Sequence, residues 1–120
     1  MRVAVIGSRS ITNYPLEEVI PPGTTEIISG GARGVDALAR EYALAHGLAY
    51  TELRPDYARY AKGAPLRRNR DIISRADYVL AIWDGESRGT AQSVSMARTM
   101  GKEVRVIRIK NRQTPEGVRR

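Results

Sequence analysis

The fold is decided by one stretch of the chain, Ser29-Gly30-Gly31-Ala32-Arg33-Gly34-Val35-Asp36. This stretch follows a short β-branched run at 25–28 and precedes apolar residues spaced i, i+3, i+4, i+7 and i+8 from Val35. The pattern predicts a strand, a glycine-rich turn and a helix. Such a turn lets the backbone approach a ligand, and the helix N-terminus offers N–H groups that suit a phosphate. A tight turn without a ligand has the same sequence pattern.

Strand-like and helix-like segments alternate along the whole chain. Strands are expected at 2–6, 25–28, 48–53, 77–83 and 104–109. Helices are expected at 34–46, 66–74 and 90–100, with at most a short helix at 14–19. The proline- and glycine-containing segment between the third strand and the following helix, 54–65, is expected to be a long connection.

The first and fourth strands, 2–6 and 77–83, are apolar at nearly every position, which is typical of strands buried on both faces of a parallel sheet. Together with the alternation of strand and helix, this predicts an α/β, Rossmann-like, doubly wound fold. We expect a mostly parallel five-stranded sheet with helices on both faces. This single domain is expected to cover 1–110, followed by a loose basic tail at 111–120.

The composition limits the classes of protein to which the chain can belong. Its 120 residues are 42% hydrophobic, enough for one globular domain with a single core. The chain has no cysteine, so disulfides and thiolate metal sites are excluded, and with His46 as the single histidine we expect no metal site. No apolar run reaches the ~18 residues of a membrane span. We therefore expect a cytoplasmic protein with no membrane contact.

The net charge of +7 is unevenly distributed. Residues 54–75 carry seven basic and two acidic side chains, and residues 102–120 carry the same numbers, whereas the rest of the chain is slightly acidic. Most of the basic side chains are arginines, which suit bidentate contact with phosphate. This distribution favours a phosphorylated or polyanionic partner, and its alternative is a solvated basic surface.

Three loops share an unusual content of glycine, serine and arginine. They follow the first, second and fourth strands, at 7–9, 29–34 and 84–90. Ligands of doubly wound sheets bind beyond the carboxyl ends of the strands, so these loops converge if the first and fourth strands are neighbours. The candidate ligand-binding residues are Gly7, Ser8, Arg9, Ser29, Gly30, Gly31, Arg33, Gly34, Asp36, Arg68, Asn69, Arg70, Asp84, Gly85, Ser87, Gly89 and Thr90.

Several of these candidates have a structural role as an alternative. Arg9 is expected to hold a phosphate or to form a surface salt bridge. Asp36 is placed to stabilise a helix dipole or to accept a hydrogen bond from a ribose hydroxyl. Asn69 and Arg70, expected at the start of a helix, are candidates for a base and a phosphate contact. Thr90 is either a phosphate ligand or a helix N-cap.

The order of the motifs resembles the SLOG superfamily, which unites DprA/Smf proteins, Lonely Guy phosphoribohydrolases and the small YspA and YpsA proteins. The matching motifs are Gly7-Ser8-Arg9, the stretch 29–36, Arg68-Asn69-Arg70 with Ile72-Ile73, and Gly89-Thr90-Ala91. The resemblance covers about residues 2–109, and the chain length is closest to the YspA-like single-domain members. It implies a Rossmann-like fold that binds a nucleotide or a nucleotide-derived phosphorylated ligand, as a sensor or carrier.

The resemblance leaves two alternative functions open. Lonely Guy enzymes cleave an N-glycosidic bond with a Pro-Gly-Gly-x-Gly-Thr-x-x-Glu motif, and here Gly89-Thr90 is kept while Ser93 replaces the glutamate. Serine cannot stabilise an oxocarbenium ion by charge, so hydrolysis would need Asp84 or Glu86 as a substitute. Whether the chain is an enzyme therefore stays open.

DprA-like binding of single-stranded DNA is the other alternative. The segment 68–73 is similar to that of DprA proteins, and the positive net charge suits a nucleic acid. Stacking partners for bases are available in Tyr57 and Tyr60, which lie among basic residues. We also expect the chain to form a homo-oligomer.

Overall fold

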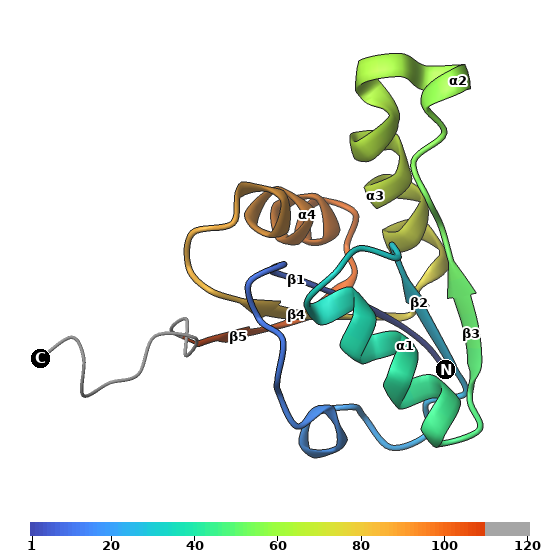
Figure 1. Cartoon of the computed structure of the whole chain (residues 1–120), viewed down its shortest axis with the longest axis vertical. Helices are drawn as coiled ribbons and strands as arrows, with labels where there is room; N and C mark the ends of the chain where they lie inside the picture. Colours follow the sequence, from blue (N-terminus) through green and yellow to red (C-terminus); the bar gives the residue numbers. More distant parts are fainter. Residues whose placement is uncertain (110–120) are drawn as a thin grey trace, which may run out of the picture.

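A sheet of five parallel strands forms the centre of the fold (Figure 1). The computed structural model describes residues 1–109. The strand order in the sheet is β3-β2-β1-β4-β5. The strands are β1 (Arg2–Gly7), β2 (Glu26–Ser29), β3 (Ala49–Glu52), β4 (Tyr78–Trp83) and β5 (Glu103–Arg108). The α/β, Rossmann-like prediction is confirmed, and the sheet is parallel throughout. The tail expected at 111–120 lies outside the described residues.

Helices cover both faces of the sheet, as predicted. The longer helices are α1 (Val35–Ala45), α3 (Ala64–Arg75) and α4 (Arg88–Thr99). The shorter elements are η1 (Leu16–Glu18), α2 (Tyr57–Tyr60) and η2 (Ala61–Gly63). Helix α1 and η1 pack on one face, and α3 and α4 pack on the other (Figure 1).

Strand β1 supplies side chains to both halves of the core. Val3 and Val5 face α1, while Ala4 and Ile6 face α3 and α4. The four side chains are buried because successive residues of a strand point to opposite faces, and both faces are covered. The burial of β1 and β4 confirms the prediction that their continuous apolar runs form strands covered on both faces.

The strand order reverses between β1 and β4, which are neighbours with Val5 opposite Leu80. The chain builds β2 and β3 on one side of β1, and then β4 and β5 on its other side. The condition for the loops after β1, β2 and β4 to converge is therefore met.

The expected connection at 54–65 is in part helical, which corrects the prediction. Helix α2 begins after Asp56, whose Oδ1 accepts a hydrogen bond from the Arg59 N–H at 3.2 Å. Helix α3 begins at Ala64, before Pro65. Proline is tolerated there because the first N–H groups of a helix have no partner within the helix.

Gly7 is required by packing between the elements around β1. A Cβ atom on Gly7 would collide with the carbonyl oxygen of Ile82 and lie 2.6 Å from Cγ2 of Val35. Gly34 has φ +78°, and a Cβ there would lie 2.5 Å from the Arg9 Cα. Both glycines therefore allow close approach between loops.

The substitution Gly7→Ala tests this packing. We expect it to lower the free energy of unfolding by about 1–3 kcal/mol, because the added methyl group has no space between β4 and α1. Urea denaturation gives this value. The control is Gly63→Ala, where a Cβ meets no atom within 4 Å and φ is −82°. Equal stability of the two variants would contradict the packing role of Gly7.

Candidate functional site

Ser8 joins the three loops at the carboxyl edge of the sheet. The Ser8 carbonyl accepts a hydrogen bond from the Val35 N–H at 3.2 Å, which fixes the start of α1. The Ser8 hydroxyl oxygen accepts one from the Asp84 N–H at 3.0 Å, which fixes the loop after β4. Because Ser8 is buried, these bonds are shielded from competing water. The loops that the sequence placed together are therefore held together.

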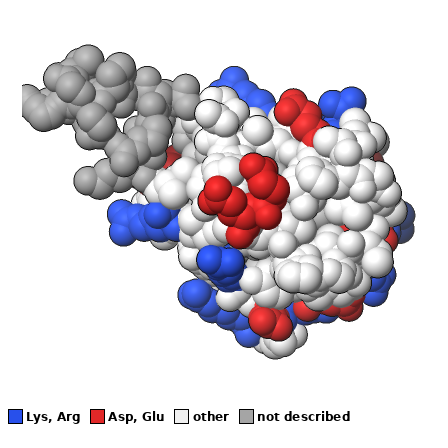
Figure 2. All heavy atoms as spheres, turned by 90° about the horizontal axis from the view of Figure 1, so that it is seen from below, with Lys and Arg blue, Asp and Glu red and all other residues white. Residues whose placement is uncertain are grey.

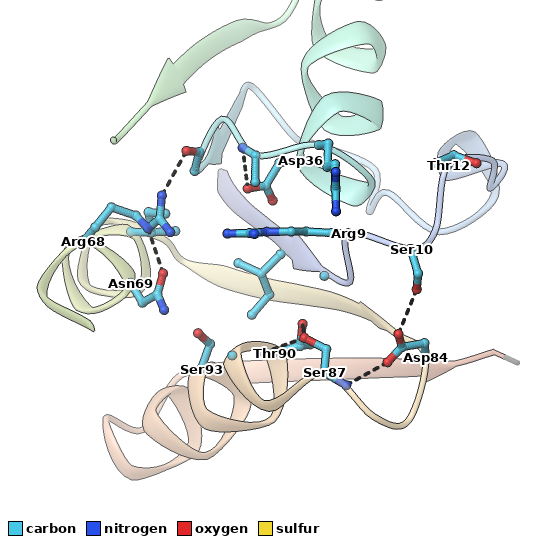
Figure 3. Close-up of a pocket in the computed structure, with 17 residues that line it drawn as sticks. Arg9, Ser10, Thr12, Asp36, Arg68, Asn69, Asp84, Ser87, Thr90 and Ser93 are labelled. Carbon is cyan, nitrogen blue, oxygen red and sulfur yellow. Dashed lines mark hydrogen bonds between the residues drawn. The ribbon is translucent and has the colours of Figure 1, made fainter. Parts of the chain in front are cut away.

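The loops enclose a cavity of about 790 Å³ beside α3 (Figure 3). Pockets for small ligands usually have volumes of roughly 300–1,000 Å³. The lining residues come from the end of β1, from the three loops and from α1, α3 and α4: Ile6, Gly7, Arg9, Ser10, Thr12, Gly30, Ala32, Arg33, Asp36, Arg68, Asn69, Ile72, Asp84, Ser87, Gly89, Thr90 and Ser93.

Arg68 is a partly buried cation whose hydrogen bonds go to neutral acceptors. Its Nη1 donates to the carbonyls of Gly30 at 3.0 Å and Leu53 at 3.3 Å, and its Nε donates to Oδ1 of Asn69 at 2.8 Å. Burial lowers the pKa of Arg68, and the negative charge of Asp36 offsets this only in part. The guanidinium is thus fixed in position with its charge incompletely compensated.

Arg9 directs a second guanidinium into the same space. Its side chain extends across the cavity toward the side where Arg68 lies (Figure 3). The positive charge of Arg9 contributes to the lowered pKa of Arg68, after the larger effect of burial. Within residues 1–109, no carboxylate lies within 4.0 Å of either guanidinium. Two such groups form a site for an anion, since guanidinium matches the geometry of phosphate and carboxylate oxygens.

Asp36 places a carboxylate on the wall of the cavity. Asp36 is only 8% exposed, and its Oδ2 accepts a hydrogen bond from the Ala32 N–H at 3.1 Å. Burial raises the pKa of Asp36, and this effect exceeds the opposing effects of the Ala32 and Gly30 N–H groups and of the charges on Arg68 and Arg9. A buried carboxylate with a raised pKa in a cavity is typical of functional sites.

Helix α4 directs its N-terminus at the cavity. Ser87 is its N-cap, and the Ser87 hydroxyl accepts a hydrogen bond from the Thr90 N–H at 3.4 Å. Gly89 and Thr90 line the cavity with Ser87 (Figure 3). The positive end of the helix dipole and the first N–H groups of this turn therefore face the same space as the arginines.

Asp84 stabilises the loop after β4. Its Oδ1 accepts hydrogen bonds from the N–H groups of Glu86 and Ser87, both at 2.8 Å, and its Oδ2 accepts one from the Ser10 hydroxyl at 2.8 Å. Partial burial raises the pKa of Asp84, but these hydrogen bonds outweigh it and the pKa falls to about 2. The carboxylate is therefore already engaged with protein donors.

Most of the candidate residues line this cavity. Those in its wall are Gly7, Arg9, Gly30, Arg33, Asp36, Arg68, Asn69, Asp84, Ser87, Gly89 and Thr90. Those outside the lining are Ser8, Ser29, Gly31, Gly34, Arg70 and Gly85. Ser8 and Gly34 act indirectly, because they let the loops approach one another.

The position expected for Asn69 and Arg70 at the start of a helix is wrong. Helix α3 begins at Ala64, so both residues lie in its middle, and Arg70 is exposed. The side chains of α3 in the cavity wall are Arg68, Asn69 and Ile72.

Three other candidates pack against neighbouring elements. Ser29 is buried, with its hydroxyl 3.3 Å from that of Tyr50. Gly31 lies against the Glu52 side chain, and Gly85 lies against the guanidinium of Arg108.

Sequence reasoning missed several lining residues. Ser10 and Thr12 continue the loop after β1, and extending that loop by three residues would have included them. Ile72 lies four residues after Arg68, so helical periodicity could have identified it. Ser93, which stands where the Lonely Guy motif has its glutamate, is buried in the cavity wall.

Comparison with known proteins gives no relative of this chain. No protein-family model, curated protein or solved structure matches it.

No helix within residues 1–109 has the length and apolar character needed to cross a membrane. The same residues contain no group of three or more His, Cys, Asp or Glu side chains that could hold a metal ion.

The role of Asp84 can be tested by its dependence on pH. We expect Asp84→Asn to lower the free energy of unfolding at pH 7 by about 1–3 kcal/mol, because hydrogen bonds to a charged acceptor are lost. The lowered pKa means that the carboxylate stabilises the fold above its ordinary pKa of about 3.9 and loses this effect as the pH falls toward 2.

Urea denaturation of both proteins at pH 7 and at pH 2.5 measures this difference. The two stabilities should converge as the pH is lowered. A difference of the same size at both pH values would contradict the role assigned to the Asp84 carboxylate.

Proposed function

We propose that the chain binds a nucleotide, or a nucleotide-derived phosphorylated ligand, in the cavity at the carboxyl edge of the sheet, as a sensor or carrier. The observation that carries the proposal is the pair of guanidinium groups, Arg9 and Arg68, that share this cavity without a carboxylate within 4.0 Å among the described residues. A phosphate satisfies both arginines at once.

The surroundings of the arginines support a phosphate in particular. The N-terminus of α4 faces the cavity with the hydroxyl groups of Ser87 and Thr90. N–H groups and hydroxyls at the positive end of a helix bind phosphate oxygens. Ile6 and Ile72 supply apolar surface for a base, and the NH2 group of the Asn69 amide, whose oxygen accepts from Arg68, can donate to the polar edge of the base.

Membership of the SLOG superfamily is part of this proposal. Its support is that the four ordered motifs each contribute to one cavity, through Arg9, Gly30, Arg68 and Thr90. These residues are far apart in the sequence and meet at the carboxyl edge of the sheet.

The hydrolase alternative depends on a carboxylate that takes the place of the Lonely Guy glutamate, where this chain has Ser93. Of the two possible substitutes, Asp84 is engaged with protein donors and Glu86 lies outside the cavity lining. Binding without hydrolysis therefore fits these residues better. Release of free base from a nucleoside 5′-monophosphate incubated with the protein would instead support an enzyme.

The substitution Arg9→Gln tests the proposed function. A thermal-shift screen of the four common ribonucleoside 5′-monophosphates selects the tightest ligand, and calorimetry then gives its affinity. Loss of a charge-assisted contact should weaken binding about 10- to 100-fold. Arg9 is exposed, so its substitution should leave the fold intact.

The matched control is Arg75→Gln. It removes the same charge from an exposed position at the end of α3, outside the cavity. This variant should bind within about twofold of the original protein, since its charge is screened from the cavity by solvent. Equal affinities of the original protein and of Arg9→Gln would reject the proposed phosphate site.

A second candidate function, binding of single-stranded DNA, is favoured by the surface of α2 and the start of α3. Tyr57 is 61% exposed, and the guanidinium groups of Arg59 and Arg67 lie 5.4 and 4.9 Å from the ring centre of Tyr60. The exposed ring of Tyr57 can stack with a base, and the arginines at the half-buried Tyr60 can contact phosphates. By contrast, the face in Figure 2 groups acidic side chains at its centre, so positive charge does not cover the molecule evenly.

Fluorescence anisotropy with a labelled oligothymidylate tests this second function. We expect affinity to fall steeply as salt rises, because phosphate neutralisation releases counterions. The variant Tyr57→Ala should lose about 1–3 kcal/mol of binding free energy at constant salt. A flat salt response, or unchanged affinity of Tyr57→Ala, would eliminate DNA binding at this surface.

A further inference from the structure

We propose that the cavity selects ribonucleotides over deoxyribonucleotides, because the carboxylate of Asp36 accepts hydrogen bonds from the hydroxyl groups of the ribose. The inference rests on the proposed nucleotide-binding function and specifies the ligand class of the same site. It assigns the phosphate to Arg9 and Arg68 and the sugar to Asp36.

The Asp36 carboxylate is fixed and turned into the cavity. The residue is 8% exposed, lies in the first turn of α1 and lines the cavity (Figure 3). The N–H group of Ala32 donates to Oδ2 at 3.1 Å, and the N–H group of Gly30 also stabilises the carboxylate. An ionised carboxylate has about four lone-pair sites, so one that is buried and oriented by two backbone donors can still accept a hydrogen bond from a ligand.

The chemistry of a carboxylate restricts what this donor can be. An ionised carboxylate only accepts hydrogen bonds, and it repels a phosphate. The donors of a nucleotide are the sugar hydroxyls and the N–H groups of the base. Arg9, Arg68 and Asp36 line the same cavity, and Arg68 and Asp36 both lie against Gly30, so the proposed phosphate site is adjacent to the carboxylate. The sugar is bonded directly to the phosphate, so the sugar reaches Asp36 before the base does.

Gly30 permits the acceptor and the cation to lie side by side. A Cβ atom on Gly30 would lie 2.7 Å from Nη1 of Arg68 and 3.0 Å from Oδ2 of Asp36. Yet the two side chains form no ion pair within 4.0 Å. Their opposite charges remain available to a ligand that has an anionic group and hydroxyl groups next to each other, which is the chemistry of a ribose phosphate.

Calorimetry with a matched pair of ligands tests the inference. The probes are the tightest-binding ribonucleoside 5′-monophosphate and its 2′-deoxy counterpart, which differ by one hydroxyl group. We expect the ribonucleotide to bind at least about tenfold more tightly, because loss of the hydroxyl leaves a buried acceptor without a donor. Equal affinities would overturn the inference.

The variant Asp36→Asn tests whether Asp36 causes the preference. The amide keeps the size of the side chain and can still accept the Ala32 hydrogen bond, so the fold is preserved. We expect the preference for the ribonucleotide to fall to about threefold or less, through weaker binding of the ribonucleotide. The control Glu41→Gln makes the same change at an exposed position of α1 and should keep the preference. An unchanged preference in Asp36→Asn would overturn the assignment.

The same titrations separate this inference from the proposed function. If both nucleotides bind equally and Arg9→Gln weakens both, the phosphate site stands and the ribose contact is wrong. If neither nucleotide binds, the proposed function and the inference fall together.

Discussion

The site depends on the hydrogen bonds of one buried residue, Ser8. Its backbone carbonyl and its hydroxyl oxygen accept N–H groups from the start of α1 and from the loop after β4. Gly7 and Gly34 make this approach possible, because a side chain at either position would collide with a neighbouring segment. Parallel strands bring the loops to one edge of the sheet, but it is Ser8 that closes the distance between them. Gly7 and Gly34 therefore serve loop packing first, and the cavity is the result of that packing.

The cavity contains charges that are costly for a protein to bury. Burial disfavours the charged forms of both Asp36 and Arg68, as their shifted pKa values indicate. Asp84 differs, because three donors within hydrogen-bond distance compensate its charge and lower its pKa. One carboxylate thus stabilises a loop, while the other carboxylate and the arginines remain incompletely compensated. Charges that the protein compensates incompletely are typical of sites that bind a ligand.

The sequence predicted the sheet well, because strands buried on both faces leave continuous apolar runs such as those of β1 and β4. It also predicted which loops meet, since that follows from parallel strands and from the reversal of strand order. It named Arg68, Asn69 and Arg70 together, and of these Arg68 and Asn69 line the cavity. The sequence places Pro65 at the end of a loop, whereas it lies in the first turn of α3, so the prediction of which α3 side chains face the cavity was wrong for Arg70. The roles of Gly7 and Gly34 depend on contacts between distant segments, which a single sequence does not specify.

Nuclear magnetic resonance of the ¹⁵N-labelled protein during titration with ribose 5-phosphate tests the central claim most directly, because this probe carries the phosphate and the sugar without a base. The account predicts that the backbone N–H signals of Ala32 and Gly89 and the Nε–H signals of Arg9 and Arg68 shift together, with a common dissociation constant. Signals that do not move, or that move only in α2 and leave those of Ala32 and Gly89 unchanged, would contradict it.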